Sequence, residues 1–292
     1  YGTGRIIRPM RKLIIQIPCY NEEKTLGVTL DALPRAVAGF DAVEWLVVDD
    51  GSTDRTAQVA REHGADHVVR HPKNRGLSRT FMTGLDAAIR LGADVIVNTD
   101  ADNQYHADDI PALVAPILEG RAEIVVGERP IADMDHFSPL KKWLQRLGSY
   151  AVRLASGTDI PDAPSGFRAF TRAAAMRLNV FDTYTYTLET IIQAGRKNMA
   201  ITSVPIRTNA DLRPSRLVKS IPGYVRRSLL TIVRIFMTYR PFHFFAVPGF
   251  VAFTLGLIPA LRFLYFYLFM IDSARGHIQS LLFAVFLMGT GC

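Results

Sequence analysis

The residues best suited to chemistry in this sequence are two carboxylates at the end of an apolar run. Asp100 and Asp102 stand in the segment VNTDADNQYHADDI, and Asp100 comes three residues after the apolar run 95–97. Side chains two apart along an extended chain project to the same side, so both carboxylates aim at one spot. Mg²⁺ or Mn²⁺ bound to phosphate oxygens needs one or two such ligands and no complete protein cage. An isolated Asp-x-Asp triplet is more often a polar turn that caps a helix, so the context decides between the two interpretations.

Two further apolar runs end in polar side chains. WLVVDDGSTDRT places Asp50 before a glycine turn, and IIQIPCYNEEKTL places Tyr20 and Glu22 after another run. We expect Asp50 to accept a hydrogen bond from a base or ribose, the Tyr20 ring to lie against a base, and Glu22 to hold ribose hydroxyls. Each segment alone is equally well explained as a strand, a turn and a capped helix. The three strand ends together predict a nucleotide-binding edge.

The elements that must position these residues alternate along the chain. Short runs rich in β-formers predict strands at 13–18, 44–49, 66–69, 94–99 and 123–127, separated by amphipathic stretches of helical period. A helix at 139–156, a strand or turn at SGFRAF, a helix near 185–196 and a strand at 200–206 extend this core. The predicted fold class is therefore α/β, a Rossmann-like domain with a mostly parallel sheet, whose ligands bind at the carboxyl edge.

The positive charge is concentrated in one segment. The 34 Lys and Arg outnumber the 27 Asp and Glu, giving +7, and the range 207–240 alone has eight basic residues against one acid. This segment directly precedes a strongly apolar run, which is typical of a cytoplasmic membrane flank and disfavours nucleic acid as the partner. Apolar residues three or four apart within 220–239 predict helices that lie in the membrane interface.

The carboxyl-terminal part predicts a membrane anchor. Residues 242–271 are apolar or aromatic except for a few positions, which is long enough to span a bilayer, and LLFAVFLMG begins a second span. The loop between them has one Arg, so the positive-inside rule places the large domain in the cytoplasm of a multi-pass membrane protein. With two cysteines and no amino-terminal signal, a reducing compartment is expected. The expected organisation is a tail at 1–12, a catalytic domain at 13–212, interface helices at 213–240 and transmembrane helices at 241–292.

Eight short motifs connect the sequence to a known family. PCYNE, DDGSTD, NRG at 74–76 and DADNQ resemble the family 2 glycosyltransferases, which are inverting enzymes of GT-A fold. VVGER, DAPSGFRAF, VPIRTNADLRPSRLVKS and GHIQSL are similar to the polyprenyl-phosphate hexosyltransferases of the dolichyl-phosphate mannose synthase group. The resemblance covers Leu13 to Leu281. The Gln-x-x-Arg-Trp sequence of processive polysaccharide synthases does not occur, so a chain-extending enzyme is disfavoured.

The resemblance implies an activity, transfer of a hexose with inversion from UDP- or GDP-hexose to a polyprenyl phosphate. Independently of the resemblance, we expect a homo-oligomer. It implies that Mg²⁺ or Mn²⁺ is held by Asp102 and Gln104, with Asp100 in the metal shell or on the ribose. The implied nucleotide-sugar site comprises Pro18, Tyr20, Glu22, Asp50, Asp100 and Ala101. The implied catalytic group comprises Asp100, Asp102, Asp162 and Arg129. The implied site for the acceptor phosphate comprises Arg129, Lys142, Arg146, Ser149, Arg168, Arg213 and Arg216.

Two other functions remain open on the sequence. A transferase acting on a lipid hydroxyl would need a general base such as Asp162. A catalytically silent membrane scaffold would keep the fold as a binding surface, although three acidic strand ends argue against it. Arg226, Arg227 and Arg234 are expected to be interfacial residues that extend toward lipid headgroups. The identities of the sugar and of the nucleotide stay open.

Overall fold

The computed structural model describes residues 11–130, 139–180, 186–210, 230, 233–234, 237–239, 241–269 and 278–291. The chain divides into two compact units, Tyr1–Ser228 and Leu229–Cys292. The larger unit holds the whole sheet and every predicted strand end, so the candidate site is built within it.

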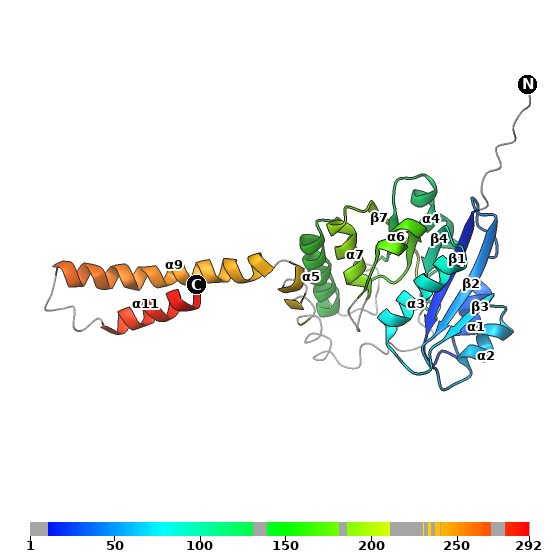
Figure 1. Cartoon of the computed structure of the whole chain (residues 1–292), viewed down its shortest axis with the longest axis horizontal. Coiled ribbons are helices and arrows are strands. Elements are labelled where there is room, and N and C mark those ends of the chain that lie inside the picture. The colour runs from blue at the N-terminus through cyan, green and yellow to red at the C-terminus, as the bar shows by residue number, and fades with distance from the viewer. Residues whose placement is uncertain are drawn as a thin grey trace, which may run out of the picture. The chain divides into compact units, whose positions relative to one another are not determined.

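Seven strands form one sheet in the order β3-β2-β1-β4-β6-β5-β7. Figure 1 labels β1 to β4 and β7 of this sheet. The strands are β1 Lys12–Cys19, β2 Ala42–Asp49, β3 His67–Arg70, β4 Val95–Asn98, β5 Ile124–Glu128, β6 Arg168–Thr171 and β7 Ile201–Pro205. The pairs β1–β2, β1–β4, β2–β3 and β5–β7 are parallel, whereas β6 is antiparallel to both β4 and β5. The predicted mostly parallel α/β sheet is confirmed. The first three residues of SGFRAF precede β6, and its last three lie in that strand.

The direction of β6 decides which loops meet. Because β6 is antiparallel, it begins at the edge where its parallel neighbours end, and Arg168 pairs with Asn98 in the register. The loop before β6 therefore lies at the same edge as the loops after β4 and β5. This edge gathers the segments around Asp100, Arg129 and Asp162.

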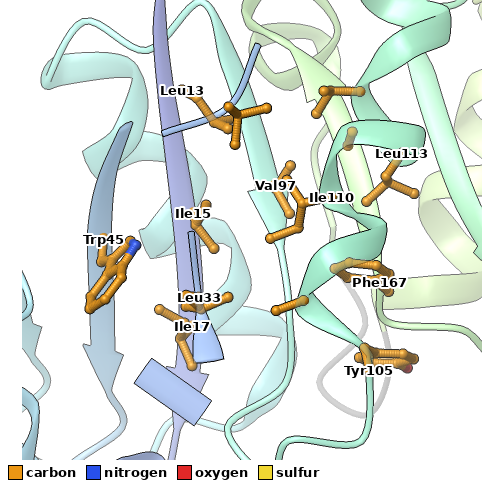
Figure 2. Close-up of a cluster of buried hydrophobic side chains, with 14 of the residues drawn as sticks. Leu13, Ile15, Ile17, Leu33, Trp45, Val97, Tyr105, Ile110, Leu113 and Phe167 are labelled. Atoms are coloured by element: carbon orange, nitrogen blue, oxygen red, sulfur yellow. The ribbon is translucent and has the colours of Figure 1, made fainter. Parts of the chain in front are cut away.

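The core has two layers because β1 is covered on both faces. Leu13, Ile15 and Ile17 point into one buried cluster, shown in Figure 2 with Ile110 and Leu113 of α4. The alternate residue Ile14 points into the other cluster, which includes Phe81 and Leu85 of α3. A parallel strand buried on both faces reads as a continuous apolar run, as β1 does.

Most helices of the larger unit agree with the predicted helical stretches, but the short helix at 172–177 was not predicted. They are α1 Leu26–Ala32, α2 Thr56–Glu62, α3 Leu77–Arg90, η1 Ala107–Asp109, α4 Ile110–Leu118, α5 Pro139–Ser156, α6 Arg172–Arg177 and α7 Tyr186–Arg196. Helix α2 ends shortly before Gly64, whose φ of 75° lies in the left-handed region that favours glycine. At the start of α2, Asp54 Oδ1 accepts from the backbone N–H of Thr56 at 3.0 Å.

The smaller unit contains α9 Pro241–Phe269 and α11 Ile278–Gly291. By length and composition alone, one helix among the described residues qualifies to cross a membrane, Phe244–Leu268, with a mean hydropathy of 2.0. Within this unit α9 and α11 pack closely, since a Cβ on Gly256 would lie 2.8 Å from Met288 Cγ. The 14 residues of α11 span only about 21 Å, so the second span of a membrane hairpin stays a prediction. The predicted interface helices fall largely outside the described residues.

Candidate active site

The two carboxylates of the DAD segment follow β4, and that of Asp100 meets two other parts of the chain. A Cβ built on Gly166 would lie 3.0 Å from Asp100 Oδ1 and 3.0 Å from Tyr186 Oη. The Asp100 carboxylate, the Gly166 backbone and the Tyr186 phenol therefore converge at the carboxyl edge of β4. Gly166 belongs to the loop before β6 and Tyr186 to the start of α7, so three elements build this point.

A buried amide connects these groups. Asn98 Nδ2 donates to the Gly166 carbonyl at 2.8 Å and to Tyr186 Oη at 2.9 Å. Its Oδ1 accepts from Gln16 Nε2 of β1 at 2.8 Å. Asn98 and Gln16 are both fully buried, and a buried amide keeps a fixed orientation because unmaking its hydrogen bonds is costly. The amide network ties the loop before β6 to the two central strands.

Two buried phenols flank the Asp100 carboxylate. Tyr105 Oη accepts from the Gly166 backbone N–H at 2.9 Å. The Tyr105 ring stacks on Phe167 at 5.1 Å between centroids, and Tyr186 stacks on Phe81 at 3.9 Å. Burial, and then the charge of Asp100, raises the pKa of both phenols. They remain protonated at neutral pH and act as fixed hydrogen-bonding groups.

An ion pair stands beside these phenols. Arg129 Nε donates to Asp162 Oδ2 at 2.7 Å and its terminal nitrogen to Oδ1 at 2.9 Å. The side chains are 9% and 1% exposed. Burial acts to lower the pKa of Arg129, but the hydrogen bonds to Asp162 outweigh it, so this pKa is raised. Arg129 stays charged, and the Asp162 carboxylate is held in a bidentate geometry.

The resemblance implies that Arg168 binds the acceptor phosphate, but its main partners in the structure are backbone carbonyls. It is fully buried and donates to the carbonyls of Ala163, Ser165 and Thr187 at 2.7 to 2.8 Å. Burial lowers its pKa to about 10. In this arrangement its guanidinium holds the loop before β6 against α7, and we assign it that positioning role. Ser149 is also buried, and its Oγ accepts from the Ala163 backbone N–H at 3.3 Å.

Asp50 organises a second loop at the same edge of the sheet. Its carboxylate accepts from the backbone N–H groups of Arg75 and Gly76 at 2.8 Å each, and His71 Nδ1 lies 2.8 Å from Oδ1. These contacts fix the NRG segment beside the end of β2. Gly51 has a φ of 74°, and a Cβ there would lie 2.6 Å from Lys73 C, so only glycine fits the turn.

The residues after β1 lie next to this loop. Glu22 is buried and accepts from Thr25 Oγ1 at 2.9 Å, while its backbone N–H donates to Thr56 Oγ1 at 2.8 Å. Tyr20 is exposed, as a ring that stacks on a base must be. Pro18 lies within β1, paired with Val48 of β2.

The donors available to a metal ion are Asp100, Asp102 and Gln104. All three are partly exposed, and the backbone N–H of Gln104 donates to Asp102 Oδ1 at 3.4 Å. Among the described residues no three His, Cys, Asp or Glu side chains gather at metal-binding distance. Two neighbouring carboxylates nonetheless fit a divalent cation that takes its other ligands from diphosphate and water. The Ala101 carbonyl accepts from Thr29 Oγ1 at 3.0 Å, which anchors the segment between the carboxylates.

The residues implied for the acceptor phosphate are only partly placed. Arg129 lies at the site, whereas Arg146 is exposed on α5. Lys142 lies on α5, and its side chain is outside the described part. Arg213 and Arg216 lie outside the described residues.

Sequence reasoning missed several residues that build the site. Asn98, Tyr105, Gly166, Tyr186 and His71 received no role from it. One signal was visible in advance, because Asn98 is a polar residue within the buried apolar run of β4. The tyrosines carry no comparable signal, since an aromatic residue at such a position is more often ordinary core.

Comparison with known proteins agrees with this geometry. The family model described as "Glycosyl transferase family 2" matches residues 14–178. The chain is 33% identical to the UDP-N-acetylglucosamine–dolichyl-phosphate N-acetylglucosaminyltransferase of Methanococcus voltae, over 66% of this chain and 83% of that one. It is 30% identical to the undecaprenyl-phosphate mannosyltransferase of Micrococcus luteus, over 73% and 90% of the two chains.

A solved structure shares the fold. Glucosyl-3-phosphoglycerate synthase from Mycobacterium tuberculosis, crystallised with Mn²⁺, UDP and glucosyl-3-phosphoglycerate, superposes with a TM-score of 0.61. The identity is 22%, over 78% of this chain and 80% of that one, so this likeness concerns the fold alone. The family predicted from the motifs and the Rossmann-like GT-A fold are confirmed. The chain belongs to glycosyl transferase family 2.

Proposed function

We propose that the protein transfers a hexose from a UDP- or GDP-hexose to a polyprenyl phosphate, with inversion at the anomeric carbon. The observation that carries this proposal is the bidentate pair between Arg129 and Asp162. A carboxylate held in that way is poorly placed to take a proton from an acceptor hydroxyl. A phosphate monoester, whose second pKa lies near about 6, is already an anionic nucleophile at neutral pH and needs no base.

The names of the relatives support the same class of acceptor. Two relatives at 30% identity or above are named for transfer to dolichyl phosphate or undecaprenyl phosphate. The structure with the shared fold holds glucosyl-3-phosphoglycerate, a soluble glucosylated molecule, which points to a different class of acceptor. The exposed apolar helix Phe244–Leu268 favours the lipid, because a soluble acceptor needs no helix of this kind.

In the proposed reaction a phosphate oxygen of the lipid attacks the anomeric carbon of the donor sugar. The bond from that carbon to the diphosphate oxygen breaks, and the nucleoside diphosphate leaves with the electron pair. Mg²⁺ or Mn²⁺ bound at Asp102 and Gln104, with Asp100, would neutralise charge on the departing diphosphate. Tyr20, Glu22 and Asp50 would hold the nucleoside.

Cationic side chains have a separate task in this scheme. Donor and acceptor are both anionic, and their mutual repulsion must be offset where they meet. Arg129 is charged and sits at the edge of the site, so we assign it to the phosphates. Arg213 and Arg216 are proposed to hold the lipid phosphate, with Lys142 and Arg146 contributing from α5.

The acceptor tail is proposed to stay in the bilayer throughout. Each buried CH₂ of a lipid chain contributes about 0.8 kcal/mol, so extraction of a long polyprenyl chain would be prohibitive. A membrane-spanning hairpin, basic interface helices and a cytoplasmic catalytic unit would bring the enzyme to the headgroup. Assembly into a homo-oligomer would be compatible with this placement.

The proposal is tested with the purified full chain in detergent micelles. Radiolabelled UDP- and GDP-hexoses are offered with polyprenyl phosphate, polyprenol or 3-phosphoglycerate, each with and without EDTA. We expect an organic-extractable product with polyprenyl phosphate alone, and its loss in EDTA. If polyprenol is the acceptor and the pH profile shows an essential basic carboxylate, the acceptor is a lipid hydroxyl. Transfer to 3-phosphoglycerate alone would overturn the lipid acceptor. A chain that turns over no donor in any arm would be the silent scaffold.

The metal assignment has its own variant. Asp102→Ala should abolish turnover at saturating Mn²⁺ or Mg²⁺, because one of the two carboxylates that fit the cation is lost. Asp86→Ala on α3, whose side chain is 69% exposed, is the matched control and should retain wild-type turnover. Full activity of the Asp102 variant would remove this residue from the metal site.

A further inference from the structure

The outward face of α5 is apolar where a helix of a water-soluble domain is normally polar. Trp143, Tyr150 and Leu154 are 57%, 57% and 51% exposed. Their spacings of seven and four residues place them in one stripe along the helix. The residues packed into the domain, including Ser149 and Val152, lie on the opposite side of the helix.

The same helix is strongly basic. Its sequence, PLKKWLQRLGSYAVRLAS, contains four Lys or Arg and no acidic residue. Arg146 and Arg153 each follow a residue of the aromatic stripe by three positions, so they lie along one edge of it. The Arg153 guanidinium is 6.0 Å from the centre of the Tyr150 ring, and it also pairs with Asp159 at 3.1 Å.

Exposed aromatic rings beside a row of cations match one kind of surface. Trp and Tyr concentrate at the level of lipid headgroups, where a ring is half in hydrocarbon and half in water. Basic side chains at that level are attracted to anionic headgroups. An exposed apolar patch edged by charge also occurs at protein interfaces, but a helix with four basic residues and no acidic one matches the anionic headgroups of a bilayer. The charge of α5 therefore favours a bilayer over a protein partner.

We propose that α5 is a membrane-docking surface of the catalytic unit, with Trp143, Tyr150 and Leu154 seated in the headgroup region of an anionic bilayer. This contact is additional to any spanning helix and belongs to the unit that carries the active site. It restricts the orientation of that unit at the bilayer, because a helix that lies in the interface fixes one face of the domain toward the lipid. The proposal requires a bilayer but does not depend on the sugar-transfer reaction.

The chain offers a direct test because it contains two tryptophans. Trp45 is buried in the core at 5% exposure, and Trp143 is on the stripe. The full chain is reconstituted in vesicles containing lipids brominated along the acyl chain, which quench only tryptophan that reaches the membrane. We expect quenching in the wild type and almost none in Trp143→Phe, which retains the Trp45 signal. If Trp143 is not quenched, the proposal is overturned. Blue-shifted emission without quenching would show that a second copy or another segment of the chain covers Trp143, which also overturns the proposal.

A second arm tests the charge. The double variant Arg146→Gln/Arg153→Gln should be quenched less than the wild type in vesicles with anionic lipid. Each lost arginine should lower the equilibrium constant for docking by about fivefold. Arg90→Gln on α3, where the side chain is 82% exposed, is the matched control and should behave as wild type. Equal quenching of the double variant and the wild type in anionic vesicles would contradict the proposed contribution of the cations. Since no nucleotide sugar is present, failure here is distinguishable from failure of the proposed transfer.

Discussion

Adding one methyl group at Gly166 would press on the Asp100 carboxylate and on the Tyr186 phenol. The new Cβ would lie 3.0 and 3.1 Å from the two carboxylate oxygens, and 3.0 Å from Tyr186 Oη. Ordinary contacts between carbon and oxygen begin at about 3.3 Å, so the carboxylate must move away from the new methyl group by about 0.3 Å. The φ of Gly166 lies outside the left-handed region, so alanine is compatible with the backbone.

The size of the effect follows from that displacement. A misplacement of about 1 Å in an active site costs about 10²-fold in rate. A shift of about 0.3 Å then lowers kcat/KM about fourfold, and about tenfold if Tyr186 moves as well. These losses correspond to about 0.8 and about 1.4 kcal/mol of activation free energy. Overpacking costs about 1 to 3 kcal/mol of stability, which leaves the chain folded at low temperature.

The assay measures kcat/KM and the Mn²⁺ concentration for half-maximal activity in Gly166→Ala. The control is Gly148→Ala on α5, where nothing lies within 4 Å of the added methyl group. We expect the control to match the wild type in rate and the Gly166 variant to need more Mn²⁺. Wild-type kcat/KM and metal response in Gly166→Ala would refute the conclusion that this close packing sets the position of the Asp100 carboxylate.

Three further predictions concern buried polar groups of the larger unit. Asp162→Asn should lower the free energy of unfolding by about 3 to 5 kcal/mol in denaturant titration, since Arg129 stays charged without its partner. Tyr186→Phe should cost about 1 kcal/mol of stability for its lost hydrogen bond and also lower kcat/KM; an unchanged kcat/KM would limit this phenol to a structural role. At Asp109, burial raises the pKa, but the hydrogen bonds from Arg207 outweigh it and lower the pKa overall. Its stabilisation is therefore complete above the unfolded pKa of about 3.9 and is lost as pH falls through the folded value. Asp109→Asn should flatten the fall of Tm in that acid range, and an unchanged Tm profile would contradict this.

Much of the fold could be predicted because its signals are local. β1 and β4 are buried on both faces, so each reads as a short apolar run that ends in a polar turn. Helix α5 extends over Pro139–Ser156, the bounds expected from the sequence. The residues at the strand ends were predicted for the same reason, since parallel strands bring their carboxyl ends to one edge.

The sequence by itself determined the family, the alternation of strands and helices, and the carboxylates at the strand ends. Only the tertiary structure decided that an antiparallel β6 enters between β4 and β5 and brings Gly166 beside Asp100. It also decided that Arg168 is buried under the site and that Asp50 holds the NRG segment. Hydrophobic periodicity reports which face of an element is buried, but not which distant element covers it. The partner of a buried polar group is set by the packing of the whole sheet, and that information does not reside in any single segment.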